Sequence, residues 1–233
     1  MNISAIIMAG GKATRFAGDV PKCLAPLSDG STLLGRLIQQ LRDARVEEII
    51  ICCSPENVES ITQFVGARAK AVACASCDLG PLPALAEALR HSSGERKLLC
   101  LADIYFHKSP FGQLEGESLA IGQDGSTAGS GWVVRDRQAV RGISYLRTPN
   151  ADARWTGTFL FDKHLAAHLS ANVDRYAKKP FEAWISDLIA EGNSLQWIDA
   201  GAFVNVNTGA DYARVLEMTR PTVHEHHAVA APV

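Results

Sequence analysis

Long apolar runs and long basic runs are both missing from this chain of 233 residues. No apolar stretch reaches the ~18 residues that a bilayer-spanning helix requires, and the chain does not open with the charged and apolar segments of a signal peptide. With a formal net charge of −2 and no cluster of Lys and Arg, the sequence also offers no surface for nucleic acid. These absences predict a cytoplasmic protein that has neither membrane nor nucleic-acid partners.

Paired cysteine motifs are also scarce, although the chain has six cysteines. One C-x-x-C spacing occurs, at Cys74 and Cys77, with no second pair and no nearby histidine to complete a zinc site, and with no thioredoxin-like context. Cys52, Cys53 and Cys100 lie in apolar runs that are typical of buried strands. We therefore interpret the thiols as structural and leave open whether Cys74 and Cys77 have a further role.

The composition is that of a folded α/β protein. Hydrophobic residues make up 47% of the chain, which is enough for a sizeable core. Strand and helix patterns alternate from residues 3–8 to residues 97–102, which predicts a mainly parallel sheet with helices on both faces. The second half is more mixed and contains a small β-hairpin insertion over residues 132–145. We expect one domain over residues 1–220 and a flexible tail over residues 221–233.

A glycine turn follows the first strand, and two cations come after it. The residues in order are Ala9, Gly10, Gly11, Lys12, Ala13, Thr14 and Arg15, and Lys22 follows seven positions later. Small residues let the backbone approach a ligand closely, and backbone N–H groups together with Arg and Lys are suited to polyphosphates. The pattern is neither the Rossmann G-x-G-x-x-G nor a Walker A loop. The alternative is a Gly-Gly turn that binds nothing, which is common in α/β proteins.

Asp103 ends the predicted fourth strand. Because parallel sheets bind ligands beyond the carboxyl ends of their strands, Asp103 and the glycine turn are expected to share a site. A carboxylate there suits Mg²⁺, which takes one or two carboxylates together with substrate phosphates. The alternative is an Asp that caps a turn or a helix. Ile104 and Tyr105 follow Asp103, so the Asp-x-Asp motif of glycosyltransferases is absent from this position.

Residues 9–15 and the later Pro21-Lys22 resemble the signature loop of nucleotidyltransferases that join a nucleoside triphosphate (NTP) to a phosphorylated small molecule. The sugar-1-phosphate nucleotidyltransferases, the bacterial phosphocholine cytidylyltransferases and the molybdenum-cofactor guanylyltransferases are similar subgroups. Ala13 stands where the family usually has Gly. The resemblance implies an enzyme with a Rossmann-like (GT-A-like) fold and with catalytic roles for Arg15 and Lys22. It also implies nucleotide contacts for Ala9, Gly10, Gly11, Lys12, Thr14, Gly80 and Ala84.

Residues 203–212 are similar to a segment near the C-terminus of the same family. Aligning the two on their Thr, Asp and Tyr puts Asn205 where the family has its second metal ligand, with Asp103 as the first. Asn supplies a carbonyl oxygen, which Mg²⁺ accepts, but no negative charge. Asn207 is the runner-up and Asp199 a third candidate. The alternative for Asn207 is simple helix capping.

Residues 142–149 and 155–159 resemble the part of the family that holds the acceptor. The family's Glu-Lys is missing, and Arg147 stands in the place of the Lys. The resemblance therefore implies acceptor contacts for Arg147, Thr156 and Gly157, with Arg147 binding the acceptor phosphate through two parallel hydrogen bonds. The alternative is that Arg147 is an exposed loop cation without a role.

These residues predict a nucleotidyltransferase that couples an NTP to a sugar-1-phosphate, with Mg²⁺ as cofactor, and forms an NDP-sugar and pyrophosphate. The nucleobase stays open, because Pro81 and Pro83 remove backbone donors where the family reads it. A phosphocholine-type cytidylyltransferase and a molybdenum-cofactor guanylyltransferase are alternatives. A non-catalytic nucleotide-binding protein is an alternative of another class, and a homo-oligomer is left open.

Overall fold

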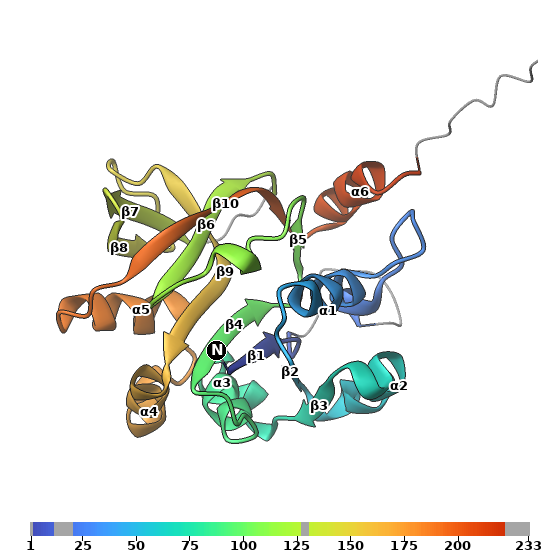
Figure 1. Ribbon diagram of the computed structural model, residues 1–233, viewed down its shortest axis with the longest axis horizontal. Coiled ribbons are helices and arrows are strands. Elements are labelled where there is room, and N and C mark those ends of the chain that lie inside the picture. Colours follow the sequence, from blue (N-terminus) through green and yellow to red (C-terminus); the bar gives the residue numbers. More distant parts are fainter. Residues whose placement is uncertain (1, 12–20, 127–130, 222–233) are drawn as a thin grey trace, which may run out of the picture.

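The computed structural model describes residues 2–11, 21–126 and 131–221 (Figure 1). Its strands are β1 (Ile3–Met8), β2 (Glu48–Cys53), β3 (Lys70–Ala73), β4 (Arg96–Leu101), β5 (Ile104–Phe106), β6 (Ser118–Asp124), β7 (Trp132–Asp136), β8 (Ala139–Ser144), β9 (Ala153–Asp162) and β10 (Gln196–Asn205). Its α-helices are α1 (Leu33–Asp43), α2 (Val58–Val65), α3 (Pro81–Leu89), α4 (Lys163–Ala171), α5 (Phe181–Ala190) and α6 (Gly209–Met218).

The first four strands form a parallel half-sheet. Strand β1 pairs with β2 on one side and with β4 on the other, and β3 continues the sheet beyond β2. Helices α1, α2 and α3 provide the crossovers between consecutive strands. This confirms the β-α-β-α-β-α-β order that the sequence predicts. Because all four strands point the same way, their carboxyl ends lie along one edge, where such sheets bind ligands.

The remaining strands form a different kind of sheet. Strand β9 runs antiparallel to β4, and the order continues through β6, β10, β8 and β7. A further pairing of β7 with β9 closes these strands into a small ring. Among the described strands, parallel pairing is confined to β1–β2, β2–β3, β1–β4 and β6–β10, and the other six pairings are antiparallel.

The expectation that the sheet as a whole is mainly parallel is therefore wrong, whereas the expected mixed character of the second half is confirmed. Strands β6 to β9 follow one another with no α-helix between them, and the connection of neighbouring parallel strands usually requires such a crossover helix. The predicted hairpin is present as β7 and β8, which pair in antiparallel register. It does not stand apart as an insertion, because both strands belong to the ring.

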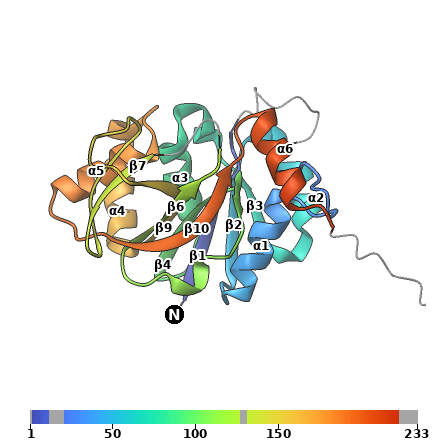
Figure 2. The ribbon, with the colours of Figure 1, turned by 90° about the horizontal axis from the view of Figure 1, so that it is seen from above.

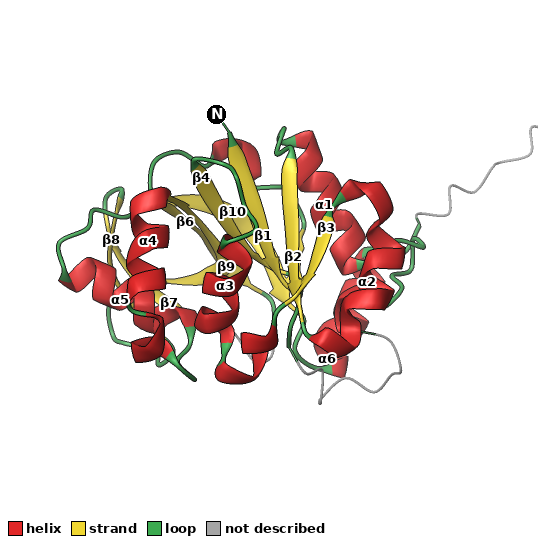
Figure 3. Ribbon diagram, turned by 90° about the horizontal axis from the view of Figure 1, so that it is seen from below, coloured by secondary structure: helices red, strands yellow, loops and turns green. Residues whose placement is uncertain are grey.

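Helices cover both faces of the sheet (Figure 2, Figure 3). The side chains of strand β1 explain why both faces are covered. Ala5 and Ile7 join the core that includes α1 and α2, whereas Ile6 joins the core that includes α3, α4 and α5. All three side chains are fully buried. A strand that is buried on both faces reads as a continuous apolar run, which explains why the sequence identifies β1 so clearly.

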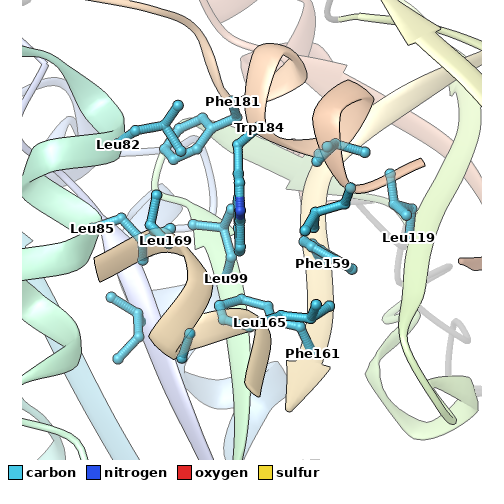
Figure 4. Close-up of a cluster of buried hydrophobic side chains, with 14 of the residues drawn as sticks. Leu82, Leu85, Leu99, Leu119, Phe159, Phe161, Leu165, Leu169, Phe181 and Trp184 are labelled. Atoms are coloured by element: carbon cyan, nitrogen blue, oxygen red, sulfur yellow. The ribbon is translucent and has the colours of Figure 1, made fainter. Parts of the chain in front are cut away.

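The core beneath α3, α4 and α5 holds the largest aromatic side chains (Figure 4). The Trp184 ring lies between the sheet and the helices, with its centroid 5.2 Å from that of Phe161 and 5.7 Å from that of Phe159. Leu82 and Phe181 pack into the same cluster. Burying a side chain of this kind contributes ~1.5–3 kcal/mol, so this cluster fixes α5 and its first residue, Phe181, against the sheet.

Two features near the expected metal site differ from the sequence pattern. The segment around Gly201 suggests two short strands, but the structure has one long strand, β10, with an irregularity between Asp199 and Gly201. Gly201 has a φ of 68°, a conformation that Gly adopts without the steric cost of a Cβ. Strand β5 is only three residues long and pairs with the end of β10.

In the part of the chain that the structure describes, no helix has the length and apolar character to cross a membrane.

Candidate active site

A cavity of about 630 Å³ opens at the carboxyl ends of β1, β2 and β4. Its wall includes five of the predicted site residues, Gly10, Gly11, Gly80, Ala84 and Asp103. Elements that are far apart in sequence thus meet at the edge where α/β sheets bind ligands. The volume lies in the range of small-molecule and cofactor sites. Lys12, Thr14 and Arg15, which the resemblance also assigns to this site, lie outside the described residues.

The turn after β1 is packed closely against the opposite wall of the cavity. A Cβ added at Gly10 would lie 2.6 Å from Cys77 Sγ, whereas a Cβ at Gly11 would meet nothing within 4 Å. Gly10 is therefore required by a close approach of backbone to side chain. Ala9 does not line the cavity; its N–H donates a hydrogen bond of 2.7 Å to the Cys52 carbonyl and so extends the pairing of β1 with β2.

Gly80 and Ala84 place the start of α3 at the cavity. Gly80 has a φ of 117°, and a Cβ there would lie 3.0 Å from the backbone nitrogen of Lys178, so both its conformation and its surroundings require glycine. Helix α3 begins at Pro81, earlier than its apolar spacing suggests. Proline fits the first helical position because its missing N–H has no partner within the helix.

Lys22 connects Asp103 to the segment that directly follows β10. Its Nζ donates hydrogen bonds of 2.7 Å to Asp103 Oδ2 and 2.6 Å to the Val206 carbonyl. The Val206 N–H in turn donates to the Asp103 carbonyl at 2.9 Å. Asp103 directly precedes β5, and Asn205 ends β10 opposite Ile104 of β5. This strand pairing explains how residues about a hundred positions apart, such as Asp103 and Asn205, come together.

Asn205 has an unsatisfied buried oxygen. Its side chain is 7% exposed, and among the described atoms its Oδ1 has no hydrogen-bond partner. Leaving a buried polar atom unpaired costs free energy, and a cation bound at this oxygen would remove that cost. Asp103 supplies a carboxylate from the residue that precedes Ile104, the backbone partner of Asn205. These oxygens fit Mg²⁺, which accepts carbonyl and carboxylate ligands and fills its other positions with water and substrate phosphates.

The described residues contain no group of three or more His, Cys, Asp or Glu side chains arranged to hold a metal. A small protein ligand set is compatible with Mg²⁺ but not with a closed zinc site. Asn207, the runner-up ligand, lies just before α6, and its N–H donates to Asp211 Oδ2 at 3.1 Å. The capping residue of α6 is Thr208, which forms a capping box with Asp211.

The predicted acceptor residues separate into two groups. Arg147 is exposed, and its guanidinium carbon lies 4.7 Å from the centroid of the Trp132 ring. Thr156 is fully buried and donates a hydrogen bond of 2.9 Å to the Ala120 carbonyl. Gly157 has a φ of 74°, and a Cβ there would lie 2.4 Å from the side chain of Leu101. Thr156 and Gly157 thus have clear packing roles, and their contact with an acceptor stays a prediction.

Arg154 is a candidate that sequence reasoning missed. Its guanidinium carbon lies 4.2 Å from the same Trp132 centroid, and its Nε is 3.8 Å from Asp124 Oδ2. Burial lowers the pKa of Arg154, but a guanidinium stays charged in proteins. The available signal was its position immediately before the Trp155-Thr156-Gly157 segment that carries the family resemblance.

Glu182 lies close to this arginine. It follows Phe181, which lines the cavity. Burial raises the pKa of Glu182, while hydrogen bonds from backbone N–H groups and the charge of Arg154 act in the opposite direction. The surroundings of Trp132 therefore combine two guanidinium groups with its indole ring, and the buried carboxyl group of Glu182 lies near Arg154.

The first half of the chain matches a known domain model. The MobA-like NTP transferase domain matches residues 5–116, which contain β1 to β5, the glycine turn, Lys22 and Asp103. Residues 5–116 are a MobA-like NTP transferase domain. The protein is thus an enzyme of the nucleotidyltransferase family, which confirms the class expected from the sequence. Among curated proteins, none matches the sequence.

Solved structures share the fold of this nucleotidyltransferase over nearly its whole length. The inositol-1-phosphate CTP transferase from T. maritima has a TM-score of 0.78 at 19% identity and covers 93% of this chain and 95% of its own. The CTP:phosphocholine cytidylyltransferase from Streptococcus pneumoniae has a TM-score of 0.78 at 16% identity, with coverages of 94% and 99%. HddC from Yersinia pseudotuberculosis, solved with GMP-PN, has a TM-score of 0.69 at 20% identity, with coverages of 94% and 99%. At these identities the similarity establishes the fold alone.

Proposed function

We propose that this nucleotidyltransferase couples an NTP to a sugar-1-phosphate and releases an NDP-sugar and pyrophosphate. The observation that carries the proposal is the juxtaposition of Lys22, Asp103 and Asn205 at the edge that holds the 630 Å³ cavity. An ammonium group, a carboxylate and an unpaired buried amide oxygen suit a phosphate and the divalent cation that accompanies it.

The nucleotide occupies the cavity in this proposal. Backbone N–H groups of Gly10 and Gly11, together with Arg15, bind the β- and γ-phosphates, and the base lies against the start of α3 near Gly80 and Ala84. Lys22 binds the α-phosphate. Glycine at position 10 supports this arrangement, because the turn has no room for a side chain on the Cys77 side.

The acceptor phosphate binds beside the nucleotide at Arg147 and Arg154. The contacts of Trp132 favour a sugar phosphate over phosphocholine as the acceptor. Two guanidinium groups lie within 5 Å of its ring centroid, and their positive charges would repel a quaternary ammonium group at this ring. The solved relative named inositol-1-phosphate CTP transferase is consistent with a phosphorylated polyol or sugar in such a fold.

In the reaction, an oxygen of the acceptor phosphate forms a bond to the α-phosphorus while the bond to the β-phosphate breaks. The attacking oxygen is already anionic, so no general base is needed and catalysis consists of positioning and charge stabilisation. Asp103 and Asn205 would hold Mg²⁺, which when bound neutralises phosphate charge. Lys22 stabilises the charge that develops on the α-phosphoryl oxygens.

The test is pyrophosphate release by the purified protein with Mg²⁺, scanned over ATP, CTP, GTP, UTP and dTTP against a panel of sugar-1-phosphates, inositol-1-phosphate and phosphocholine. Release with one NTP and a sugar-1-phosphate, abolished by EDTA, is the expected result. Release with phosphocholine alone would replace the proposed acceptor. NTP binding without release from any pair would favour the non-catalytic alternative.

A further inference from the structure

Cys77 forms part of the wall of the nucleotide cavity. It lies in the 3-10 turn Ala75–Leu79 that precedes α3, and it lines the cavity together with Gly10 and Gly80. Its side chain is partly exposed, whereas the other five cysteines are buried. Cys77 is therefore the thiol in this protein that a small reagent can reach, and the route to it runs through the cavity.

The surroundings of Cys77 favour its thiolate. A hydrogen bond from the Cys52 thiol beneath it lowers the pKa of Cys77, against the opposing effects of burial and of the carboxylates of Glu87, Glu56 and Asp78. Contacts with Cys74 and then with Cys77, together with burial, raise the pKa of Cys52, which keeps that thiol protonated. A thiolate is the reactive form of cysteine, so Cys77 combines reactivity with access.

The remaining thiols lack this combination. Burial raises the pKa of Cys23 to about 12 and that of Cys53 to about 12, and it also raises the pKa of Cys100. Cys74 is fully buried. All of these thiols are buried, so a thiol reagent is expected to select Cys77.

We propose that Cys77 is a covalent modification site that forms a mixed disulfide with low-molecular-weight disulfides, and that this adduct excludes the nucleotide. The Cys77 thiolate attacks one sulfur of the small disulfide, a new S–S bond forms, and the old S–S bond breaks. The other half leaves as a thiolate and takes up a proton from water. Cys52 stays protonated beneath the adduct and is a poor nucleophile for displacing it.

The geometry on the Gly10 side determines where the adduct must lie. An atom the size of a Cβ on Gly10 would already be 2.6 Å from Cys77 Sγ, so there is no space between the sulfur and the glycine turn. A group attached to this sulfur must therefore extend into the cavity. This inference rests on the proposed function, in which the cavity holds the NTP.

The experiment incubates the reduced protein with glutathione disulfide and follows the intact mass and the modified peptide. NTP binding is measured before modification, after it and after reversal with dithiothreitol. We expect one adduct, on Cys77, a loss of NTP affinity of about tenfold or more, and recovery on reduction. Prior saturation with the bound NTP and Mg²⁺ should slow the formation of the adduct. The Cys77→Ser variant should form no adduct, and its ratio of treated to untreated affinity should stay at one.

Two further variants test whether the modification is specific to Cys77. Cys74→Ser, in the same C-x-x-C spacing but fully buried, should react like the wild type. Cys52→Ala removes the donor to Cys77 and should shift the pH profile of adduct formation to higher pH. If NTP binds but neither protects Cys77 nor loses affinity after its modification, the inference is wrong while the nucleotide site stands. If no NTP binds the unmodified protein, the proposed function fails and this inference fails with it.

Discussion

In the first half of the chain, β1 to β4 run parallel and a cavity opens at their carboxyl ends, whereas in the second half β6 to β10 form a closed ring of mostly antiparallel strands. The first half presents backbone and small residues to the cavity, at Gly10, Gly11 and Gly80. The second half contributes Trp132 with two arginines and the buried Glu182. We refer to them as the nucleotide half and the acceptor half.

The difference between the two halves explains which part of the chain the known domain matches. The domain match covers residues 5–116 and so ends where the acceptor half begins. Solved relatives whose names carry different acceptors share the overall fold. One fold thus accommodates several substrates, as is usual when function depends on the side chains of a site. Under the proposed function, the nucleotide half supplies the groups for the reaction, and the acceptor depends on the side chains of the other half.

The largest expected effect tests the junction between the halves. Lys22→Ala and Asp103→Asn should each lower kcat by about 10²–10³, because each removes charge stabilisation at the reacting phosphate or its cation. The measurement is steady-state pyrophosphate release, with thermal unfolding as the check on folding. Lys163→Ala is the matched control, since it breaks an exposed ion pair of 2.8 Å with Glu95 remote from the cavity. Full activity of either site variant would exclude the proposed mechanism.

The next effect concerns the metal. Asn205→Ala removes the amide oxygen, and the Mg²⁺ concentration for half-maximal activity should rise about tenfold or more. Asn205→Asp keeps an oxygen ligand and adds a charge, so the required Mg²⁺ concentration should fall below that of the wild type. The measurement is a Mg²⁺ titration of activity at fixed NTP. An equal and unchanged requirement in both variants would show that Asn205 is not a ligand.

Much of the nucleotide half could be predicted from the sequence. The strand β1 has the bounds that its apolar run indicates, and the glycine turn, Gly80 and Asp103 come to one cavity. Local signals suffice for the glycine turn and Asp103 because each follows a strand, and parallel strands bring their carboxyl ends together. The family resemblance also pairs Asn205 with Asp103, and the pairing of β10 with β5 brings their segments together; their role as metal ligands stays a prediction.

The acceptor half was less predictable because its key contacts join distant segments. Arg154 meets Trp132 through the pairing of β7 with β9, and no periodicity in the sequence indicates that pairing. Thr156 matched the motif of an acceptor residue, yet its side chain donates a hydrogen bond to the Ala120 carbonyl within the ring of strands. The proximity of Cys77 to Gly10 likewise depends on the packing of a 3-10 turn, which a spacing of cysteines does not encode.

A smaller effect is expected in the acceptor half. Arg147→Gln and Arg154→Gln should each raise the KM for the acceptor about tenfold, because each removes a charged hydrogen-bond donor worth ~1.5–3 kcal/mol. The KM for the NTP should stay close to the wild-type value in both variants. Arg141→Gln is the control, as it lies in β8 in an exposed pair with Asp136. A rise in the KM for the NTP instead would contradict the division into two halves.

The smallest effect is on stability and concerns a close contact of the nucleotide half. Gly10→Ala places a Cβ 2.6 Å from Cys77 Sγ, and overpacking of this kind costs ~1–3 kcal/mol. For a chain of this size the melting temperature should fall by roughly 2–4 °C per kcal/mol. Gly11→Ala, whose Cβ would meet nothing within 4 Å, should leave the melting temperature unchanged. The double variant Gly10→Ala with Cys77→Ala removes the sulfur and should recover most of the loss, since residues in contact show non-additive effects. Additive losses in the double variant would mean that the cost at position 10 arises from the backbone of the turn and not from the thiol opposite it.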